Sequence, residues 1–234
     1  MKKKLKYVVF GSLLAGQFAF AGAEDDPVLA RVMIDKFEWR NADAGSLWAW
    51  DADAWVGQDI NKLWFKTEGE YADGSTESAY VEALYSRAIS SFWDLQAGWR
   101  HDFYPKPARD WVAVGVKGLA PYWFELDATL YAGGNGTISG RVDAEYEILF
   151  NQKLILTPEV ELAFSADEDP ARGIGSGLTD MELGLRLRYE IRREFAPYIG
   201  VNWEKKFGAT ADYAEEEGET SDEVQFVAGV RAWF

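Results

Sequence analysis

Polar and apolar residues alternate along most of the chain. In the last twelve residues, apolar side chains occupy nearly every second position from Val224 to Phe234. A period of two is typical of a β-strand. The predicted strands are residues 32–39, 47–56, 62–71, 78–89, 92–102, 111–118, 123–132, 139–149, 154–164, 179–190, 196–206 and 223–234. Twelve segments of this length favour a bacterial β-barrel, which has an even number of strands.

The connections between these segments alternate in length. Residues 89–91, 119–122, 150–153 and 191–195 form short turns, whereas the intervening loops are mostly longer and often acidic or glycine-rich. Outer-membrane barrels have short periplasmic turns and longer extracellular loops. The predicted fold is therefore all-β: a transmembrane antiparallel up-and-down β-barrel of about 12 strands, of outer-membrane type. We expect residues 207–222 to form an acidic loop, and Pro158 to cause a bulge.

The N-terminus indicates export. Four of the five residues from Lys2 to Lys6 are lysine, Tyr7 to Phe20 are mainly apolar, and small residues follow up to Ala23. This is the pattern of a Sec-type signal peptide over residues 1–23. We expect a short periplasmic extension over residues 24–31, a barrel over residues 32–234, and a location in the Gram-negative outer membrane. With no cysteine in the chain, disulfides are excluded.

Sorting the strands by alternate positions predicts two different faces. One carries residues such as Trp48, Leu63 and Phe65 and is expected to contact outer-membrane lipid. The other carries most of the strand charge, for example Asp51, Glu68 and the run of alternate charges from Arg141 to Glu147. A soluble sandwich cannot bury this many ionised groups. A hydrated or salt-bridged barrel interior can hold them.

The acidic composition changes the expected partners. Loss of the signal peptide takes the formal net charge from −15 to about −19. Such a chain repels nucleic acid and attracts cations. An acidic lumen favours binding or passage of cations. The alternative is a sealed structural barrel without transport, in which the acids pair with arginines such as Arg141 and Arg186.

Pairs of carboxylates spaced by two residues point to the same side of a strand and provide ligands for hard or borderline cations. Copper(I) prefers thiolate or thioether ligands, and the mature chain has only Met33 and Met181. The candidate metal ligands are Asp51, Asp53, Glu68, Glu70, Asp102, Glu125, Asp127 and His101. Pairing with neighbouring arginines is an equally open role for the carboxylates.

His101 is the only histidine, and its position in the alternation places it on the outer face, where an interfacial polar role is the alternative to metal binding. Outer-membrane lipid hydrolases have a serine two residues after a surface histidine, but here that residue is Phe103. A hydrolase needs a nucleophile beside its base. We therefore expect that the chain is not an enzyme.

Several longer stretches resemble the copper-resistance protein B family of proteobacterial outer membranes. They are residues 50–55 (WDADAW), 61–70 (NKLWFKTEGE), 98–102 (GWRHD), 115–125 (ending APYWFE), 172–178 (RGIGSGL) and 187–201 (beginning LRYEIRREFAPY). The resemblance implies an outer-membrane barrel in copper homeostasis, with copper ions as ligand but no tightly bound cofactor. It also implies periplasmic copper-handling proteins as partners. Many members carry a Met- and His-rich segment after the signal peptide, where this chain has Glu24-Asp25-Asp26-Pro27-Val28.

Overall fold

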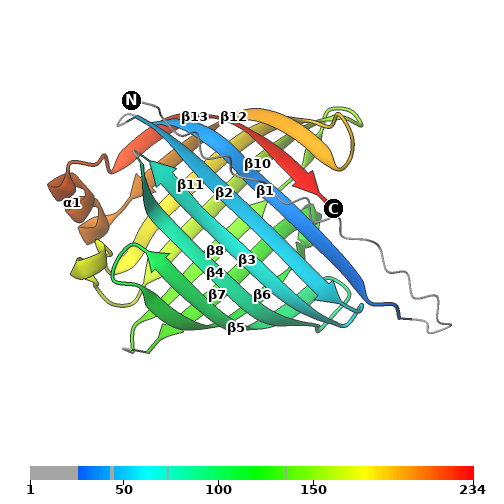
Figure 1. Cartoon of the computed structure of the whole chain (residues 1–234), viewed down its shortest axis with the longest axis horizontal. Coiled ribbons are helices and arrows are strands. Elements are labelled where there is room, and N and C mark those ends of the chain that lie inside the picture. Colours follow the sequence, from blue (N-terminus) through cyan, green and yellow to red (C-terminus); the bar gives the residue numbers. More distant parts are fainter. Residues whose placement is uncertain (1–25, 43–44, 73, 135) are drawn as a thin grey trace, which may run out of the picture.

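The computed structural model describes residues 26–42, 45–72, 74–134 and 136–234, so the predicted signal peptide lies outside the described residues. Most of the described chain forms one sheet that closes on itself (Figure 1). The strands are β1 (Leu29–Ala42), β2 (Gly45–Gly57), β3 (Asn61–Ala72), β4 (Ser75–Ala88), β5 (Trp93–Tyr104), β6 (Arg109–Ala120), β7 (Phe124–Gly133), β8 (Ile138–Glu145), β9 (Ile148–Leu149), β10 (Leu154–Ser165), β11 (Gly177–Tyr189), β12 (Phe195–Lys206) and β13 (Asp222–Trp233).

Each strand pairs antiparallel with its neighbours, and β1 closes the barrel by pairing with both β2 and β13. The two-residue strand β9 follows β8 and pairs with the same neighbour, β10. The two keep one register against β10 and together make one interrupted strand, so the wall has twelve strands. The predicted closed antiparallel barrel of about 12 strands is confirmed. β1 begins at Leu29, so residues 29–31 of the segment expected as an extension belong to the wall.

The wall is irregular at several places, of which the one in β1 changes the lumen. In β1 the register shifts at Asp35, and this bulge directs both Asp35 and Lys36 into the lumen. The expected bulge at Pro158 was wrong, because Pro158 keeps regular register with Leu185 of β11. The interruption lies in the neighbouring strand, between Glu145 and Ile148. Pro158 has no N–H to donate to that neighbour, and its carbonyl accepts a bond from Tyr146 N–H.

The two ends of the barrel differ in their connections. At the turn end, short turns such as residues 58–60 and 190–194 join the strands. At the loop end lie the longer connections, including the 3-10 helix η2 (Pro170–Arg172) and the helix α1 (Gly208–Glu217). A third short helix, η1 (Pro121–Trp123), belongs to the turn end. No helix among the described residues is long and apolar enough to cross a membrane.

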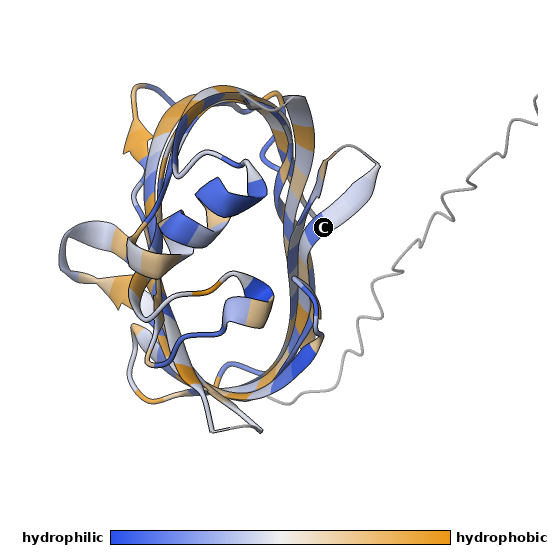
Figure 2. Ribbon diagram, turned by 90° about the vertical axis from the view of Figure 1, so that its left-hand side faces the viewer, coloured by the Kyte–Doolittle hydropathy of each residue, from blue (hydrophilic) through white to orange (hydrophobic). Residues whose placement is uncertain are grey.

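The predicted acidic loop over residues 207–222 does connect β12 to β13, but ten of its residues form the helix α1, which sequence reasoning did not predict. Thr210 and Ala214 are its buried positions, and Gly218 ends it in a left-handed conformation at φ 85°. Figure 2, which looks at the loop end, shows α1 and η2 lying inside the outline of the barrel wall. Connections that are distant in sequence therefore meet over the mouth of the lumen.

The outer and inner faces have opposite character. Large apolar side chains such as Val112, Leu130 and Phe226 are exposed on the outside. Buried polar side chains, among them Glu38, Gln96 and Asn202, face inward. An apolar exterior around a polar interior is the arrangement of a barrel surrounded by lipid. The two predicted faces are therefore present.

Candidate functional site in the barrel lumen

Charged side chains divide the lumen into two chambers. The loop-end chamber has a volume of about 310 Å³ and is lined by eight carboxylates and four arginines. The turn-end chamber has a volume of about 360 Å³ and is lined by ten carboxylates and six basic groups. Each chamber therefore has four more carboxylates than basic groups. Glu68, Tyr80, Tyr131 and Arg141 line both chambers and mark the boundary between them.

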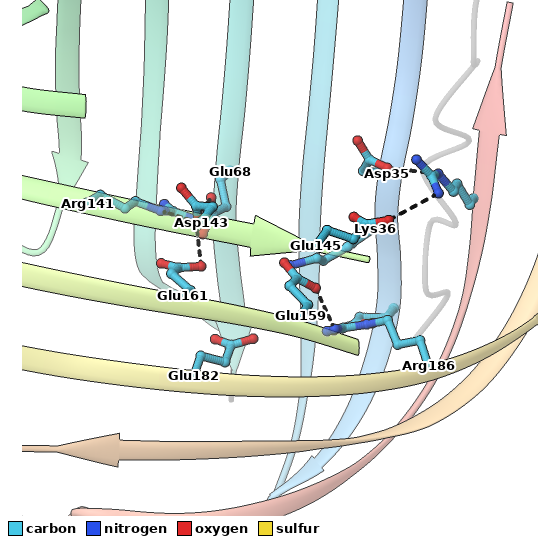
Figure 3. A network of polar contacts seen from close by, with 12 residues as sticks. Asp35, Lys36, Glu68, Arg141, Asp143, Glu145, Glu159, Glu161, Glu182 and Arg186 are labelled. Carbon is cyan, nitrogen blue, oxygen red and sulfur yellow. Dashed lines mark hydrogen bonds and ion pairs between the residues drawn. The ribbon is translucent and has the colours of Figure 1, made fainter. Parts of the chain in front are cut away.

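Arg141 of β8 reaches across the lumen at this boundary. Its Nη2 lies 2.7 Å from Oε2 of Glu68 on β3 and 2.7 Å from Oε2 of Glu161 on β10. Its Nε donates to Asp143 (3.0 Å), and Nη1 donates to the hydroxyl of Tyr80 (3.0 Å). Figure 3 shows Arg141 among these carboxylates. Because β3 and β8 are five strands apart in the twelve-strand order, this guanidinium bridges the barrel interior.

A second set of cross-lumen contacts centres on Glu38, which is fully buried. Its carboxylate accepts hydrogen bonds from Arg40 Nε (2.8 Å), Arg186 Nε and Nη2 (2.9 and 2.8 Å) and the Tyr198 hydroxyl (2.9 Å). Arg186 also donates to Glu159 (2.8 Å), which pairs with Lys36. Figure 3 shows Lys36, Glu159 and Arg186 of this second group beside the first. Charge-assisted bonds of this kind fix the side chains they join.

The structure brings together five of the eight predicted metal ligands. The turn-end chamber is lined by Asp51, Asp53, Glu68, Glu125 and Asp127. The loop-end chamber contains Glu70 and Asp102, as well as Glu68 at the boundary. Asp51 and Glu68 are direct partners in the register of β2 and β3. The spacing of two residues therefore places these carboxylates on one face, as expected.

Most of these carboxylates have a basic partner. Asp127 lies 2.7 Å from Lys66 Nζ and 3.5 Å from Lys117 Nζ. Asp53 lies 3.4 Å from Arg31, and Glu70 lies 3.1 Å from Arg40. The remaining pairs are Glu68 with Arg141, and Asp102 with Arg100 and Arg172.

Asp51 and Glu125 differ from the other predicted carboxylates in the lumen. In the described part of the chain, neither has a hydrogen bond or an ion pair. Both line the turn-end chamber, whose wall already carries excess negative charge. They are therefore the two predicted ligands best placed to accept a mobile cation.

His101 lies on the outer surface near the loop end. Its ring stacks on Trp99, with centroids 5.8 Å apart, and meets Phe103 edge-on, with centroids 4.6 Å apart. Its Nδ1 lies 2.8 Å from Asp110 Oδ1. Trp99 Nε1 donates to the same oxygen at 3.0 Å. The structure thus separates His101 from the seven predicted carboxylates. Copper binding by His101 stays a prediction.

The donors that line the two chambers are mainly carboxylate oxygens. Within the described ranges, no group of three or more His, Cys, Asp or Glu side chains is arranged to hold a metal ion. Arg141 occupies the point where Glu68, Asp143 and Glu161 converge. The oxygen donors match copper(II) and other borderline cations rather than copper(I).

Sequence reasoning missed several charged residues of the lumen. Lys36, Glu38 and Arg40 occupy alternate positions of the first strand. The alternation of polar and apolar residues could therefore have predicted that all three face the lumen. Asp35 continues the inward alternation of Arg31 and Met33, and the bulge in β1 turns the adjacent Lys36 inward as well. Arg172 lies in a loop, where no periodicity applies. Its side chain is nevertheless buried in the mouth of the barrel.

The loop-end mouth is held closed by contacts between loops and wall. Arg172 Nη2 donates to Asp102 Oδ2 (2.9 Å), and Arg172 Nε donates to the Pro105 carbonyl (3.3 Å). Helix α1 is tied to the η2 loop because Thr210 Oγ1 accepts from Gly175 N–H at 2.9 Å. These contacts form a cap, residues 166–176 with α1, over the loop-end chamber (Figure 2).

We expect Arg172→Gln to loosen the cap. A hydrogen bond to a charged partner contributes roughly 1.5–3 kcal/mol, so the opening free energy of residues 166–176 should fall by about that amount. Asp102 keeps Arg100 and Trp111 as partners, which limits the damage to the wall. Hydrogen–deuterium exchange of residues 166–176 measures the effect, with Glu216→Gln on exposed α1 as control. Unchanged exchange in the variant would mean that Arg172 does not hold the cap.

Comparison with known proteins agrees with this architecture. Two solved porin structures match the fold at 13% sequence identity. The KdgM porin matches with a TM-score of 0.55, covering 86% of this chain and 99% of its own. The NanC porin matches with a TM-score of 0.56, covering 87% and 99%. At this identity the likeness shows the fold alone: a porin-like outer-membrane barrel.

Sequence comparison identifies the family. The family model described as "Copper resistance protein B precursor (CopB)" matches residues 28–234. Copper resistance protein B of Escherichia coli is 46% identical over 210 residues, which are 90% of this chain and 71% of that protein. The homolog from Pseudomonas syringae pv. tomato is 45% identical over the same shares. The chain therefore belongs to the copper resistance protein B family and is located in the outer membrane.

Proposed function

We propose that this barrel binds copper(II), or another divalent cation, in its lumen and conducts it across the outer membrane. The observation that carries the proposal is the charge of the lumen. Both chambers have more carboxylates than basic groups, and Asp51 and Glu125 face the turn-end chamber without an ion-pair partner in the described structure. Low-dielectric walls that carry one sign of charge concentrate the opposite ion.

The predicted ligands divide into two stations under this proposal. Glu70 and Asp102 lower the energy of a cation in the loop-end chamber, and Asp51, Asp53, Glu68, Glu125 and Asp127 do so in the turn-end chamber. The names of the relatives support copper as the cation. Oxygen donors support copper(II) as the oxidation state. A periplasmic copper-binding protein is the partner that this route requires at the turn end.

The test is copper(II) flux into liposomes that contain the purified barrel. In the double variant Asp51→Asn/Asp53→Asn we expect flux to fall about tenfold or more. One charge at about 4 Å contributes on the order of 4 kcal/mol at an effective dielectric constant near 20, and each 1.4 kcal/mol is a factor of ten. Thermal stability should change little, since Asp51 has no ion pair among the described residues and Asp53 has only Arg31 at 3.4 Å.

A matched control removes two charges outside the lumen and outside the cap. Asp59→Asn/Glu77→Gln makes the same change in net charge at two exposed positions that line neither chamber. An equal loss of flux in both double variants would refute a specific role of the lumen carboxylates. Absence of flux through the native barrel, together with a loss of thermal stability in Asp51→Asn/Asp53→Asn, would support the sealed structural barrel instead.

A further inference from the structure

A third pocket lies at the turn end of the barrel, where the lumen faces the periplasm. It has a volume of about 290 Å³ and lies between the ends of β1, β11, β12 and β13. Its charged lining residues are Arg31, Arg188, Arg193 and Arg231, with Glu147 and Glu190. Four basic groups thus face two acidic groups. Arg31 and Arg231 also line the turn-end chamber, where they pair with Asp53 and Asp35. Arg188 and Arg193 are the basic groups that line this periplasmic pocket and neither chamber.

Two buried donors of this pocket lack an acceptor. Arg188 is 6% exposed, and its Nε has no hydrogen-bond partner within the described structure. The Nε atom of Arg31 is also buried and has no hydrogen-bond partner within the described structure. A buried N–H group without an acceptor is costly, and buried polar groups are normally satisfied. The arrangement of these two arginines therefore calls for an acceptor that the described chain does not supply.

The existing carboxylates do not saturate the arginines. Glu147 Oε1 accepts from Arg188 Nη2 (2.5 Å) and from Arg231 Nη1 (3.2 Å), so one carboxylate serves two guanidinium groups. Glu190 is more distant, 3.9 Å from Arg188. Arg193 is exposed on the turn between β11 and β12, and no ion pair joins it to another described residue. Each guanidinium has five N–H donors, so unused donors remain.

We propose that the periplasmic pocket binds an oxyanion, either a carboxylate or a phosphate group. Guanidinium groups match such planar or tetrahedral anions with paired hydrogen bonds. The anion accepts hydrogen bonds from the Nε groups of Arg31 and Arg188 and contacts Arg193 at the rim of the pocket. Its source is either a small free oxyanion or the acidic side chains of a polypeptide. This site is independent of copper in the lumen, so binding is measured without metal.

The test is titration calorimetry of the full barrel in detergent micelles with three probes: inorganic phosphate, citrate and hexaglutamate. We expect saturable binding by the native protein and a loss of affinity on the order of tenfold in Arg193→Gln, because a bond to a charged group is removed. Arg188→Gln should lose at least as much. Because Arg188 is buried and could be needed for folding, the exposed Arg193 variant carries the test.

The neighbouring residue provides the control. Arg192 is also exposed on the same turn but does not line the pocket, so Arg192→Gln changes the net charge equally and should retain native affinity. Tighter binding of hexaglutamate than of citrate or phosphate identifies a polypeptide source, and the reverse order identifies a free oxyanion. Equal losses in the Arg192 and Arg193 variants, or no binding of any probe by the native protein, would overturn the proposal.

Discussion

Replacing Arg141 by alanine should join the two chambers and raise the conductance of the barrel in planar bilayers. The Arg141 guanidinium contacts Glu68, Asp143 and Glu161 from three different strands and forms the boundary of both chambers. Its removal leaves three carboxylates around an opened space. Native protein should show small or rare current steps, and Arg141→Ala should show larger, cation-selective ones.

The same substitution should strengthen cation binding. Arg141 is an internal cation that competes with copper(II) for the same oxygens. One charge pair at about 4 Å is worth on the order of 4 kcal/mol at an effective dielectric constant near 20. We therefore expect copper(II) to bind at least about tenfold more tightly to Arg141→Ala, as measured by calorimetry.

Arg141→Lys separates charge from shape. Lysine keeps the positive charge but lacks the planar fork that allows arginine to bridge several carboxylates. We expect a partial rise in conductance in this variant, with copper(II) affinity close to that of the native protein. If alanine and lysine give the native conductance, the constriction lies elsewhere, and the cap formed by residues 166–176 with α1 becomes the place to look.

The strands and their two faces were predictable because both depend on local sequence. Alternation from Lys62 to Tyr71, for example, fixes the inward direction of Lys66, Glu68 and Glu70 whatever the rest of the chain does. The lengths of the connections fix antiparallel order in the same way. The number of strands and the acidic lumen follow from these local rules.

The contacts across the lumen were not predictable, because they depend on barrel closure and stagger. Lys66 is in register with Asp53 on the neighbouring strand, but its closest partner is Asp127, on a strand four positions away. The tilt of the strands in the closed barrel decides which charged side chains meet across the lumen. The alternation of residues along one strand carries no information about that tilt. The cap was missed for a different reason: α1 has only ten residues, and its Thr210 is held by Gly175 of another loop.

Glu38→Gln should cause a large loss of stability, about 3–5 kcal/mol in the free energy of unfolding. Removal of one partner from a buried ion pair leaves the other charge uncompensated, and penalties of this size are typical. Glu38 is fully buried and accepts four hydrogen bonds, three of them from Arg40 and Arg186. Glutamine keeps the shape and one acceptor oxygen but removes the charge. Urea titration of the folded barrel in micelles measures the change, with exposed Glu216→Gln as control.

A double variant shows whether charge imbalance is the cause. Arg186→Gln removes a cation that Glu38 shares with Glu159. If excess positive charge destabilises Glu38→Gln, adding Arg186→Gln should restore part of the stability. The loss of unfolding free energy in the double variant should then be smaller than the sum of the losses in the two single variants. Additive losses would instead mean that water enters and solvates the freed groups. The backbone ladder, rather than the cross-lumen charges, would then keep the barrel closed.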